Sequence, residues 1–281
     1  MKPVTIGTLP LHLDFRTANF PAVALLSTVA AQYGFPGGLV PGVGLFAYLT
    51  QPVVAEWGRD WLTRGTIAAR FLKPVLDGER VTVHARRHDT THPVLALELR
   101  NVQGLCCAIA TAELPSQAAS HPDLANYPPH DLPAVGSLLP ARIESLGSLP
   151  RPLGSLEFPA RWQSPVEGPE PFVAALCDPS PIYRGDHAAC HPALVVAYAN
   201  YLLMQNFDLG PWLHVASRVQ YFALPREDEL VTLRGRIVAA YVKRGHEFVE
   251  ADLALFDAGQ RPLAQILHTA IIRPARASSA T

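Results

Sequence analysis

Two short stretches of this 281-residue chain repeat each other and indicate how it folds. Residues 41–48 read PGVGLFAY and residues 191–198 read HPALVVAY, so that a branched aliphatic residue, an alanine and a tyrosine recur at matching places. The offset between the two stretches is 150 residues (191 − 41). At the same offset, three residues fall on identical ones: Glu79, Val81 and Thr82 on Glu229, Val231 and Thr232. Two separated blocks that share one offset indicate an internal duplication.

Each repeat begins with an apolar segment that is predicted to form a buried helix. Residues 43–51 and 193–207 are almost wholly apolar and lack the polar stripe of a surface helix. Pro52 is predicted to end or kink the first of these helices. Neither predicted helix contains Asp or Glu, so we do not expect a helix carboxylate to act as a general base.

Four strands are predicted after each helix, because β-branched and aromatic residues alternate there with short turns. In the first half they cover residues 65–71, 79–88, 94–102 and 105–114. In the second half they cover residues 215–222, 229–241, 247–256 and 262–272. A meander that follows one buried helix predicts an antiparallel sheet wrapped around that helix. We therefore expect an α+β fold with two such repeats.

The composition between the repeats divides the chain. Residues 116–153 are rich in proline and other turn formers, which is typical of a linker. We expect a first half at residues 1–115, a linker at 116–153, and a second half at 154–281 that carries the candidate catalytic residues.

Charge and cysteine usage narrow the classes of partner. The 23 Lys and Arg against 24 Asp and Glu give a net charge of −1, which does not favour nucleic acid or an anionic membrane. Residues 17–55 carry no charged residue or histidine, but glycines and prolines interrupt them too often for a membrane span. The four cysteines show no CxxC spacing, and Asp14 and Arg16 do not fit a signal peptide. We expect a cytoplasmic protein with neither disulfides nor a metal site, and a small apolar partner.

Three motifs carry a resemblance to a known family. They are FPGGLVPG at residues 35–42, FLKPVLDGE at 71–79 and DPSPIY at 178–183. Together with the duplication, they resemble the MaoC-like (R)-specific enoyl-CoA hydratases and 3-hydroxyacyl-thioester dehydratases, which have a double hot-dog fold. The resemblance implies an enoyl or 3-hydroxyacyl substrate carried on CoA or on acyl-carrier protein, and no cofactor.

The third motif departs from the family at the residues that carry the chemistry. Hydration needs a base for water, an acid for the α-carbon and donors for the thioester oxygen. In the family, an Asp and a His five positions apart do the acid–base work. Asp178 matches that Asp, but Tyr183 stands where the His belongs, and Ser180 replaces the Asn between them. A tyrosine of ordinary pKa, about 10, is a poor base at neutral pH.

A second pair has the same spacing. Asp186 and His191 are also five residues apart, and His191 falls at the start of the second predicted helix. His191 can replace the missing base in space by facing Asp178 or Asp186. The alternative is that His191 and Asp186 only cap or solvate the start of that helix.

The resemblance also suggests substrate-binding residues. In the family an amide at the start of the central helix binds the thioester oxygen, a role open to Gly42; the alternative is a loop that needs positive φ. Asn200 orients a water or a carbonyl, or is a satisfied structural amide. Tyr198 and Ser180 complete this set. Hot-dog dehydratases and thioesterases with a helix carboxylate are excluded, since the positions that correspond to it hold Ala47, Ala197, Thr50 and Asn200.

Two other functions stay open. One is a paralogue that binds an acyl thioester without catalysis, which Tyr183 and the absent Asn favour. The other is an isomerase or cyclase that uses Tyr183 as proton donor on a bulky polyketide-like substrate. His214 and His268, in or beside apolar strands, are predicted to be core or sheet-face residues. A monomer and a homodimer both fit, because two repeats in one chain can mimic a hot-dog dimer.

Overall fold

The computed structural model describes residues 11–13, 38–76, 78–89, 93–134, 136–160, 176, 178–184, 188–225 and 229–275. Its two long helices are α2 (Gly42–Arg64) and α4 (Pro192–Asn206). The strands of the first half are β1 (Leu11–Leu13), β2 (Thr66–Phe71), β3 (Val81–Asp89), β4 (Pro93–Asn101) and β5 (Cys106–Glu113). The later strands are β6 (Leu139–Pro140), β7 (Arg151–Pro152), β8 (Leu156–Pro159), β9 (Phe207–Asp208), β10 (Leu213–Tyr221), β11 (Leu230–Lys243), β12 (His246–Asp257) and β13 (Pro262–Arg273). Short 3-10 turns are η1 (Leu124–Asn126), η2 (Ile143–Ser145) and η3 (Pro181–Tyr183).

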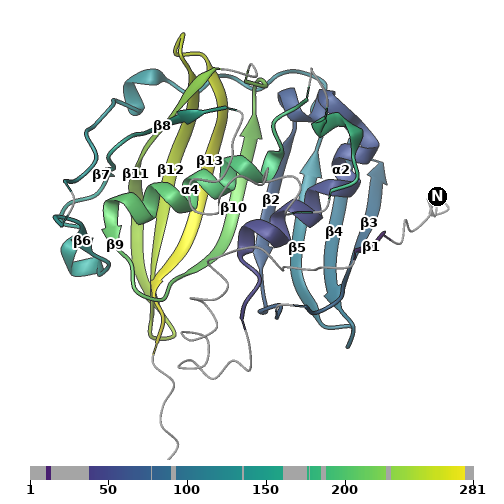
Figure 1. Ribbon diagram of the computed structural model, residues 1–281, viewed down its shortest axis with the longest axis horizontal. Coiled ribbons are helices and arrows are strands. Elements are labelled where there is room, and N and C mark those ends of the chain that lie inside the picture. The colour runs from purple at the N-terminus through teal and green to yellow at the C-terminus, as the bar shows by residue number, and fades with distance from the viewer. Residues whose placement is uncertain are drawn as a thin grey trace, which may run out of the picture.

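One curved sheet runs through both halves (Figure 1). In the described part of the chain it has eleven strands in the order β1-β3-β4-β5-β2-β10-β13-β12-β11-β7, with β8 also paired to β11. The halves meet where β2 pairs antiparallel with β10, with Ala69 opposite Ser217. Both helices lie against this sheet and pack on each other. The predicted architecture, two buried helices each wrapped by an antiparallel meander, is confirmed.

Helix α2 is longer than the sequence predicts. Pro52 lies inside it, and the break comes six residues later at Gly58, whose φ of 56° favours glycine. The helix continues past Pro52 because Val53 and Trp61, both 0% exposed, are held in the core. Tertiary packing here outweighs the local cost of proline.

The extra turns of α2 also bring in acidic residues, so the prediction of a helix without Asp or Glu is wrong. Glu56 forms an ion pair with Arg87, and Asp60 pairs with Arg64 at 3.2 Å. Both acids are exposed, on the C-terminal part of the helix. They are surface pairs far from the start of α2.

The core lies between the helices and the sheet. Phe46 and Leu49 of α2 and Leu202 and Leu203 of α4 are 0% exposed. Burial of one such side chain contributes roughly 1.5–3 kcal/mol. Both helices are apolar because one side of each packs on the sheet and another side packs on the other helix.

Part of the segment between the halves packs on the outer face of the sheet, over its second half. Tyr127 is 2% exposed and clusters with Ala254 and Phe256, whereas the alternate residue Leu253 faces the helix side. The Tyr127 hydroxyl donates a hydrogen bond to Oδ1 of Asp252 at 2.8 Å and accepts one from the side-chain amide of Gln265 at 2.8 Å.

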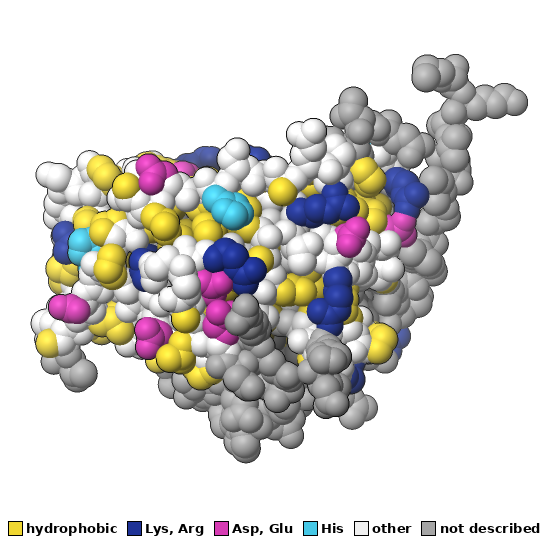
Figure 2. Space-filling model, turned by 90° about the horizontal axis from the view of Figure 1, so that it is seen from above, with side chains coloured by type: hydrophobic (Ala, Val, Ile, Leu, Met, Phe, Trp, Pro, Cys, Tyr) yellow, Lys and Arg dark blue, Asp and Glu magenta, His cyan; other side chains and the backbone are white. Residues whose placement is uncertain are grey.

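The surface carries charges of both signs. Seen from above, basic and acidic side chains lie near one another among hydrophobic ones (Figure 2). Two ion pairs join an exposed arginine to a largely buried acid: Arg261 with Asp257 at 2.8 Å, and Arg273 with Glu247 at 3.1 Å. No helix among the described residues has the length and apolarity needed to cross a bilayer.

Candidate functional site

Helix α4 begins at the histidine that the sequence singles out. His191 directly precedes the helix, and its Nδ1 accepts a hydrogen bond from the backbone N–H of Ala193 at 3.1 Å. Pro192 occupies the first helical position, where a missing N–H removes no intrahelical bond. The sequence His-Pro-Ala therefore fixes the start of α4 and turns the imidazole back over it.

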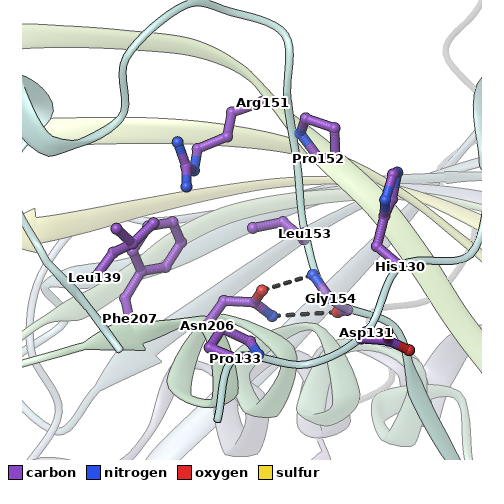
Figure 3. A pocket seen from close by; sticks show the side chains of 10 residues that line it. All are labelled: His130, Asp131, Pro133, Leu139, Arg151, Pro152, Leu153, Gly154, Asn206 and Phe207. Atoms are coloured by element: carbon purple, nitrogen blue, oxygen red, sulfur yellow. Dashed lines mark hydrogen bonds between the residues drawn. The ribbon is translucent and has the colours of Figure 1, made fainter. Parts of the chain in front are cut away.

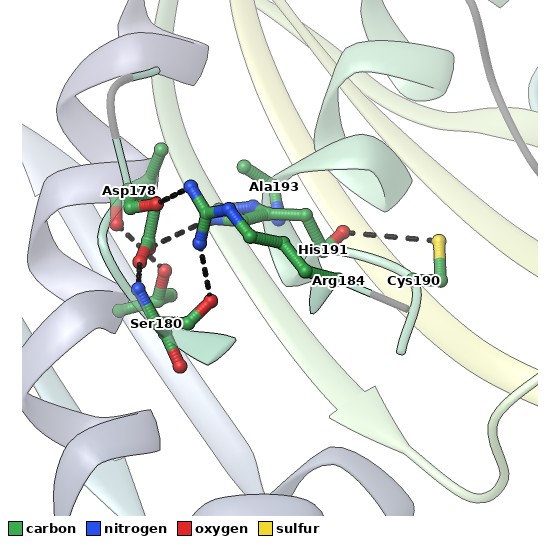
Figure 4. A network of polar contacts seen from close by, with 8 residues as sticks. Asp178, Ser180, Arg184, Cys190, His191 and Ala193 are labelled. Atoms are coloured by element: carbon green, nitrogen blue, oxygen red, sulfur yellow. Dashed lines mark hydrogen bonds and ion pairs between the residues drawn. The ribbon is translucent and has the colours of Figure 1, made fainter. Parts of the chain in front are cut away.

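The carboxylate of Asp178 lies beside the other nitrogen of that ring (Figure 4). Nε2 of His191 is 3.3 Å from Oδ2 of Asp178, and each residue is 1% exposed. Because Nδ1 accepts a bond from Ala193, the neutral ring carries its hydrogen on Nε2 and donates it to the carboxylate. Burial lowers the pKa of His191, and the contact with Asp178 opposes this only in part. The neutral imidazole thus orients a buried carboxylate.

A tight turn brings Asp178 to this place. Its Oδ1 accepts the backbone N–H of Ser180 at 2.8 Å, and η3 follows from Pro181. The guanidinium of Arg184 donates to the backbone oxygen of Asp178, and to that of Ser180 at 2.6 Å. These bonds close the loop around its own backbone and leave the carboxylate directed inward.

Tyr183 completes the cluster. Its ring centroid lies 4.6 Å from that of His191, and the residue is 6% exposed. Among the described residues the hydroxyl has no hydrogen-bond partner. Burial, followed by the charge of Asp178, raises the pKa of Tyr183 far above its usual value. The phenol is therefore a hydrogen-bond donor at neutral pH and not a base.

The structure places the other predicted residues differently. Asp186 lies outside the described residues. Ser180 contributes its backbone N–H to the turn. Tyr198 is buried and its ring stacks on Phe158, and Asn200 lies one further half-turn along α4. At 1.5 Å per residue, these two positions are about 10 and 13 Å along the axis from His191. Their backbone positions are therefore about two to two and a half turns of helix beyond His191.

The two helices differ in the amides at their N-termini. In α4 the first position is Pro192, which has no N–H, and the next N–H, of Ala193, is bound to His191. In α2 the N–H groups of Gly42 and Val43 have no acceptor within the described part of the chain. Of the two helix starts, therefore, only that of α2 has amides with no acceptor among the described residues. These amides support the predicted role of Gly42 in binding a thioester oxygen. The alternative, a loop residue with positive φ, does not hold, because Gly42 is the first residue of α2 and its φ is not positive.

Three buried polar side chains of the second half, joined by hydrogen bonds, lie beside Gly42. Oγ of Ser217 is 2.8 Å from Nε2 of His214 and 3.0 Å from Nδ1 of His268. The imidazoles stack with centroids 4.3 Å apart, and the three residues are 9%, 2% and 0% exposed. A Cβ built on Gly42 would be 2.8 Å from Nδ1 of His214. The His214–Ser217–His268 chain thus abuts the start of α2.

Sequence analysis treated His214 and His268 as separate core or sheet-face residues and did not connect either one with Ser217. Residues three apart on a regular strand point to opposite sides of the sheet. In β10 a bulge between His214 and Ala216 shifts the register and returns both side chains to one face. His268 of β13 lies directly opposite Ser217 in the ladder. The signal that was available is the pair of histidines flanking a serine across two predicted neighbouring strands.

Comparison with known proteins now bears on the fold. No protein-family model and no curated sequence matches the chain. Solved structures do match. A Mycobacterium tuberculosis protein described as having a double hotdog fold is 14% identical, with a TM-score of 0.54 over 89% of this chain and 87% of its own. This chain has the double hot-dog fold.

Two further solved structures match the chain over most of its length. A Chloroflexus aurantiacus protein described as a MaoC domain dehydratase is 8% identical, at a TM-score of 0.57, with 91% of this chain and 88% of that one covered. A Lactobacillus plantarum protein described as an oleoyl thioesterase is 10% identical at 0.51, covering 96% and 98%. The resemblance to MaoC-like proteins is confirmed at the level of the fold.

In this double hot-dog chain, the helix N-termini lie at opposite ends of β10. His214 near its start adjoins Gly42, whereas Tyr221 at its end donates its hydroxyl to the backbone oxygen of Pro192 at 3.2 Å. Seven residues of strand separate them, about 23 Å at 3.3 Å per residue. The two groups of polar residues are therefore distinct.

A pocket of about 190 Å³ lies elsewhere, at the C-terminal end of α4 (Figure 3). The amide of Asn206 pairs there with the backbone N–H and oxygen of Gly154, at 2.6 and 3.2 Å. The pocket lies roughly 22 Å, the length of α4, from Asp178 at the other end of that helix. Among the described residues, no group of three or more His, Cys, Asp and Glu side chains is placed to hold a metal ion.

Proposed function

We propose that this chain is a hydratase or dehydratase of an acyl thioester and that it works at the start of α4. One observation carries the proposal: a buried carboxylate, Asp178, contacts His191 and lies in one cluster with the hydroxyl of Tyr183, which has no partner among the described residues. The likeness in fold to a MaoC domain dehydratase supports it. The substrate is an enoyl or 3-hydroxyacyl group on CoA or on a carrier protein.

Each residue has a definite part in hydration. The carboxylate of Asp178 accepts a proton from water while the water oxygen bonds to C3 of the enoyl group. It then returns that proton to C2, so that one water is added across the double bond. Tyr183 donates a hydrogen bond to the thioester oxygen, a role that the amides at the start of α4 cannot fill. His191 is a positioning residue, because its ring nitrogens bind Asp178 and Ala193.

The test follows loss of the conjugated enoyl-thioester absorbance with enoyl-CoA esters of several chain lengths. Asp178→Asn keeps the size of the side chain and removes the base, so kcat is expected to fall roughly 100- to 10,000-fold. Tyr183→Phe removes one donor to the developing oxyanion, and kcat is expected to fall roughly 100-fold. Tyr241→Phe, on the exposed part of β11, is the matched control and keeps the wild-type rate. Equal rates in all four proteins would remove Asp178 and Tyr183 from the mechanism.

The same experiment distinguishes the two rival functions. Tight acyl-CoA binding by calorimetry, with no turnover of any ester, identifies a binding paralogue. Product mass identifies an isomerase, because isomerisation leaves the mass unchanged and hydration adds one water. The phenol of Tyr183, which has no hydrogen-bond partner in the described part of the chain, favours the isomerase over the binding protein.

A further inference from the structure

The pocket at the C-terminal end of α4 is lined by two parts of the chain that are distant in sequence (Figure 3). The segment between the halves contributes most of the lining, and the end of the helix contributes Asn206 and Phe207. β6 and β9 pair in parallel, with Leu139 opposite Phe207, and join these two parts. The pocket of about 190 Å³ is smaller than ordinary ligand pockets, which have roughly 300–1,000 Å³. At about 30 Å³ per water-sized group, it has room for a ligand of about six heavy atoms.

Most polar groups in the lining are already bonded or directed elsewhere. The side chain of Asn206 is paired with the backbone N–H and oxygen of Gly154. The backbone N–H and oxygen of His130 are both bonded to a serine of the same segment. The side chain of Asp131 is directed away from Arg151 in Figure 3. The side chains of Arg151 and His130 are therefore the polar groups that remain for a ligand.

Arg151 brings a positive charge that no described acid neutralises. Its Nη1 donates a hydrogen bond to the backbone oxygen of Leu146 at 2.9 Å, and it forms no ion pair with any described residue. A guanidinium has five N–H donors in a planar fork that fits a carboxylate, so most of the donors of Arg151 are available. The residue is only partly exposed, and its charge is screened less than on an open surface. The lining therefore favours an anion.

The end of α4 does not cancel this preference. A helix C-terminus carries a partial negative charge, on carbonyl oxygens that lack a partner. Here the oxygen of Leu202 accepts a bond from the Asn206 amide at 2.8 Å, and the oxygen of Leu203 accepts the backbone N–H of Phe207. These bonds reduce the negative charge that faces the pocket.

The lining around the guanidinium is apolar. Leu153 and Phe207 are each 1% exposed, and Leu139 packs against the core. In Figure 3 the guanidinium of Arg151 lies on the side of the pocket where Leu139 and Phe207 are found. An anion bound to Arg151 can thus place a short alkyl chain against these side chains.

We propose that this pocket binds a small organic anion, a carboxylate with a short alkyl chain, through the guanidinium of Arg151. The ligand connects the segment between the halves with the end of α4. The proposal goes beyond the function at the start of α4 and does not depend on it, because the pocket lies at the other end of the helix and takes no part in the reaction.

The experiment is isothermal titration calorimetry of the whole chain with butyrate, which has six heavy atoms. Butyrate is expected to bind saturably with a Kd of about 1 mM or below. Butan-1-ol and butylamine keep the chain but lack the carboxylate, and are expected to bind at least about 10-fold more weakly. Inorganic phosphate keeps the negative charge but lacks the chain, and is also expected to bind at least about 10-fold more weakly.

Two variants place the binding in this pocket. Arg151→Met keeps a long side chain and removes the charge, so the affinity for butyrate is expected to fall at least about 10-fold. Arg142→Met, at an exposed position of the same segment outside the pocket, is the matched control and keeps the wild-type Kd. Because Arg151 also bonds Leu146, Leu139→Trp is the second variant. It fills the pocket, keeps the guanidinium and is expected to abolish binding.

Circular dichroism establishes that each variant is folded, and the ligand series on the wild-type protein tests the proposal even where a variant is not. Absence of saturable butyrate binding at millimolar concentrations would overturn the proposal. Equal affinity for butyrate and butan-1-ol, or for butyrate and phosphate, would overturn it too. So would a wild-type Kd in folded Arg151→Met or in folded Leu139→Trp.

Discussion

Acid should destabilise this protein through histidines that are buried as neutral imidazoles, and His268 is the sharpest case. Burial lowers the pKa of His268 from 6.5 to about 3. Below pH 6.5 the unfolded chain therefore binds a proton at this residue that the folded chain refuses. The stabilising contribution of the neutral ring is complete above pH 6.5, and it is lost as the pH falls toward 3.

The size of the effect follows from that pKa difference. Each pH unit between the two values costs about 1.4 kcal/mol per buried histidine. Between about pH 6.5 and 4.5, His268 alone removes roughly 2.5 kcal/mol from the free energy of unfolding, a large share of ordinary domain stability. Burial also lowers the pKa of His191 and that of His214, so these residues add loss in the same direction.

Urea unfolding followed by fluorescence of the four tryptophans, at about pH 7.5 and about pH 4.5, measures this loss. His268→Gln removes the titrating group and keeps a partner for Ser217. The variant is expected to lose roughly 2.5 kcal/mol less than the wild-type protein between the two pH values. His88→Gln, on the exposed end of β3, is the control and follows the wild-type curve. If His268→Gln and the wild-type protein lose the same stability, the ring of His268 is not buried as a neutral group.

Two further changes test the packing. Asn206→Ala leaves the buried backbone N–H of Gly154 without an acceptor, so the free energy of unfolding should fall by about 1–3 kcal/mol. A loss under about 0.5 kcal/mol, measured by urea unfolding, would contradict this contact. Gly65→Ala places a Cβ against the ring of Trp61 and should lower Tm, whereas Gly210→Ala has open space and negligible effect. Equal Tm values for these two glycine variants would show that the Trp61 ring does not cover Gly65.

Local patterns predict most of the sheet because its hairpins are formed by neighbours in sequence. The predicted strand at residues 262–272 is β13 at Pro262–Arg273, and the predicted helix at 193–207 is α4 at Pro192–Asn206. Helix α2 was underestimated because Pro52 is expected to end or kink a helix. Only the contacts of Val53 and Trp61 with the rest of the core explain why it continues.

Some contacts at the candidate sites could also be predicted from local sequence, and others could not. Asp178 and His191 are thirteen residues apart on one loop and helix start, so the sequence could predict that they meet. The contact of His214 with Gly42 could not be predicted from local pattern. It needs the pairing of β2 with β10 across the halves, and the bulge that turns His214 to the face of Ser217.

The duplication explains why the two helix starts differ in chemistry. At the 150-residue offset, Pro41 corresponds to His191 and Gly42 to Pro192. In α4 this exchange places a histidine cap on one amide and removes another, so the start of the helix holds a carboxylate and a phenol instead of amide donors. In α2 the glycine leaves room for the His214 ring, which a larger residue would displace. The carboxylate of Asp178 and the phenol of Tyr183 therefore lie at the start of one helix, whereas the imidazole beside the start of the other helix, that of His214, comes from the opposite half.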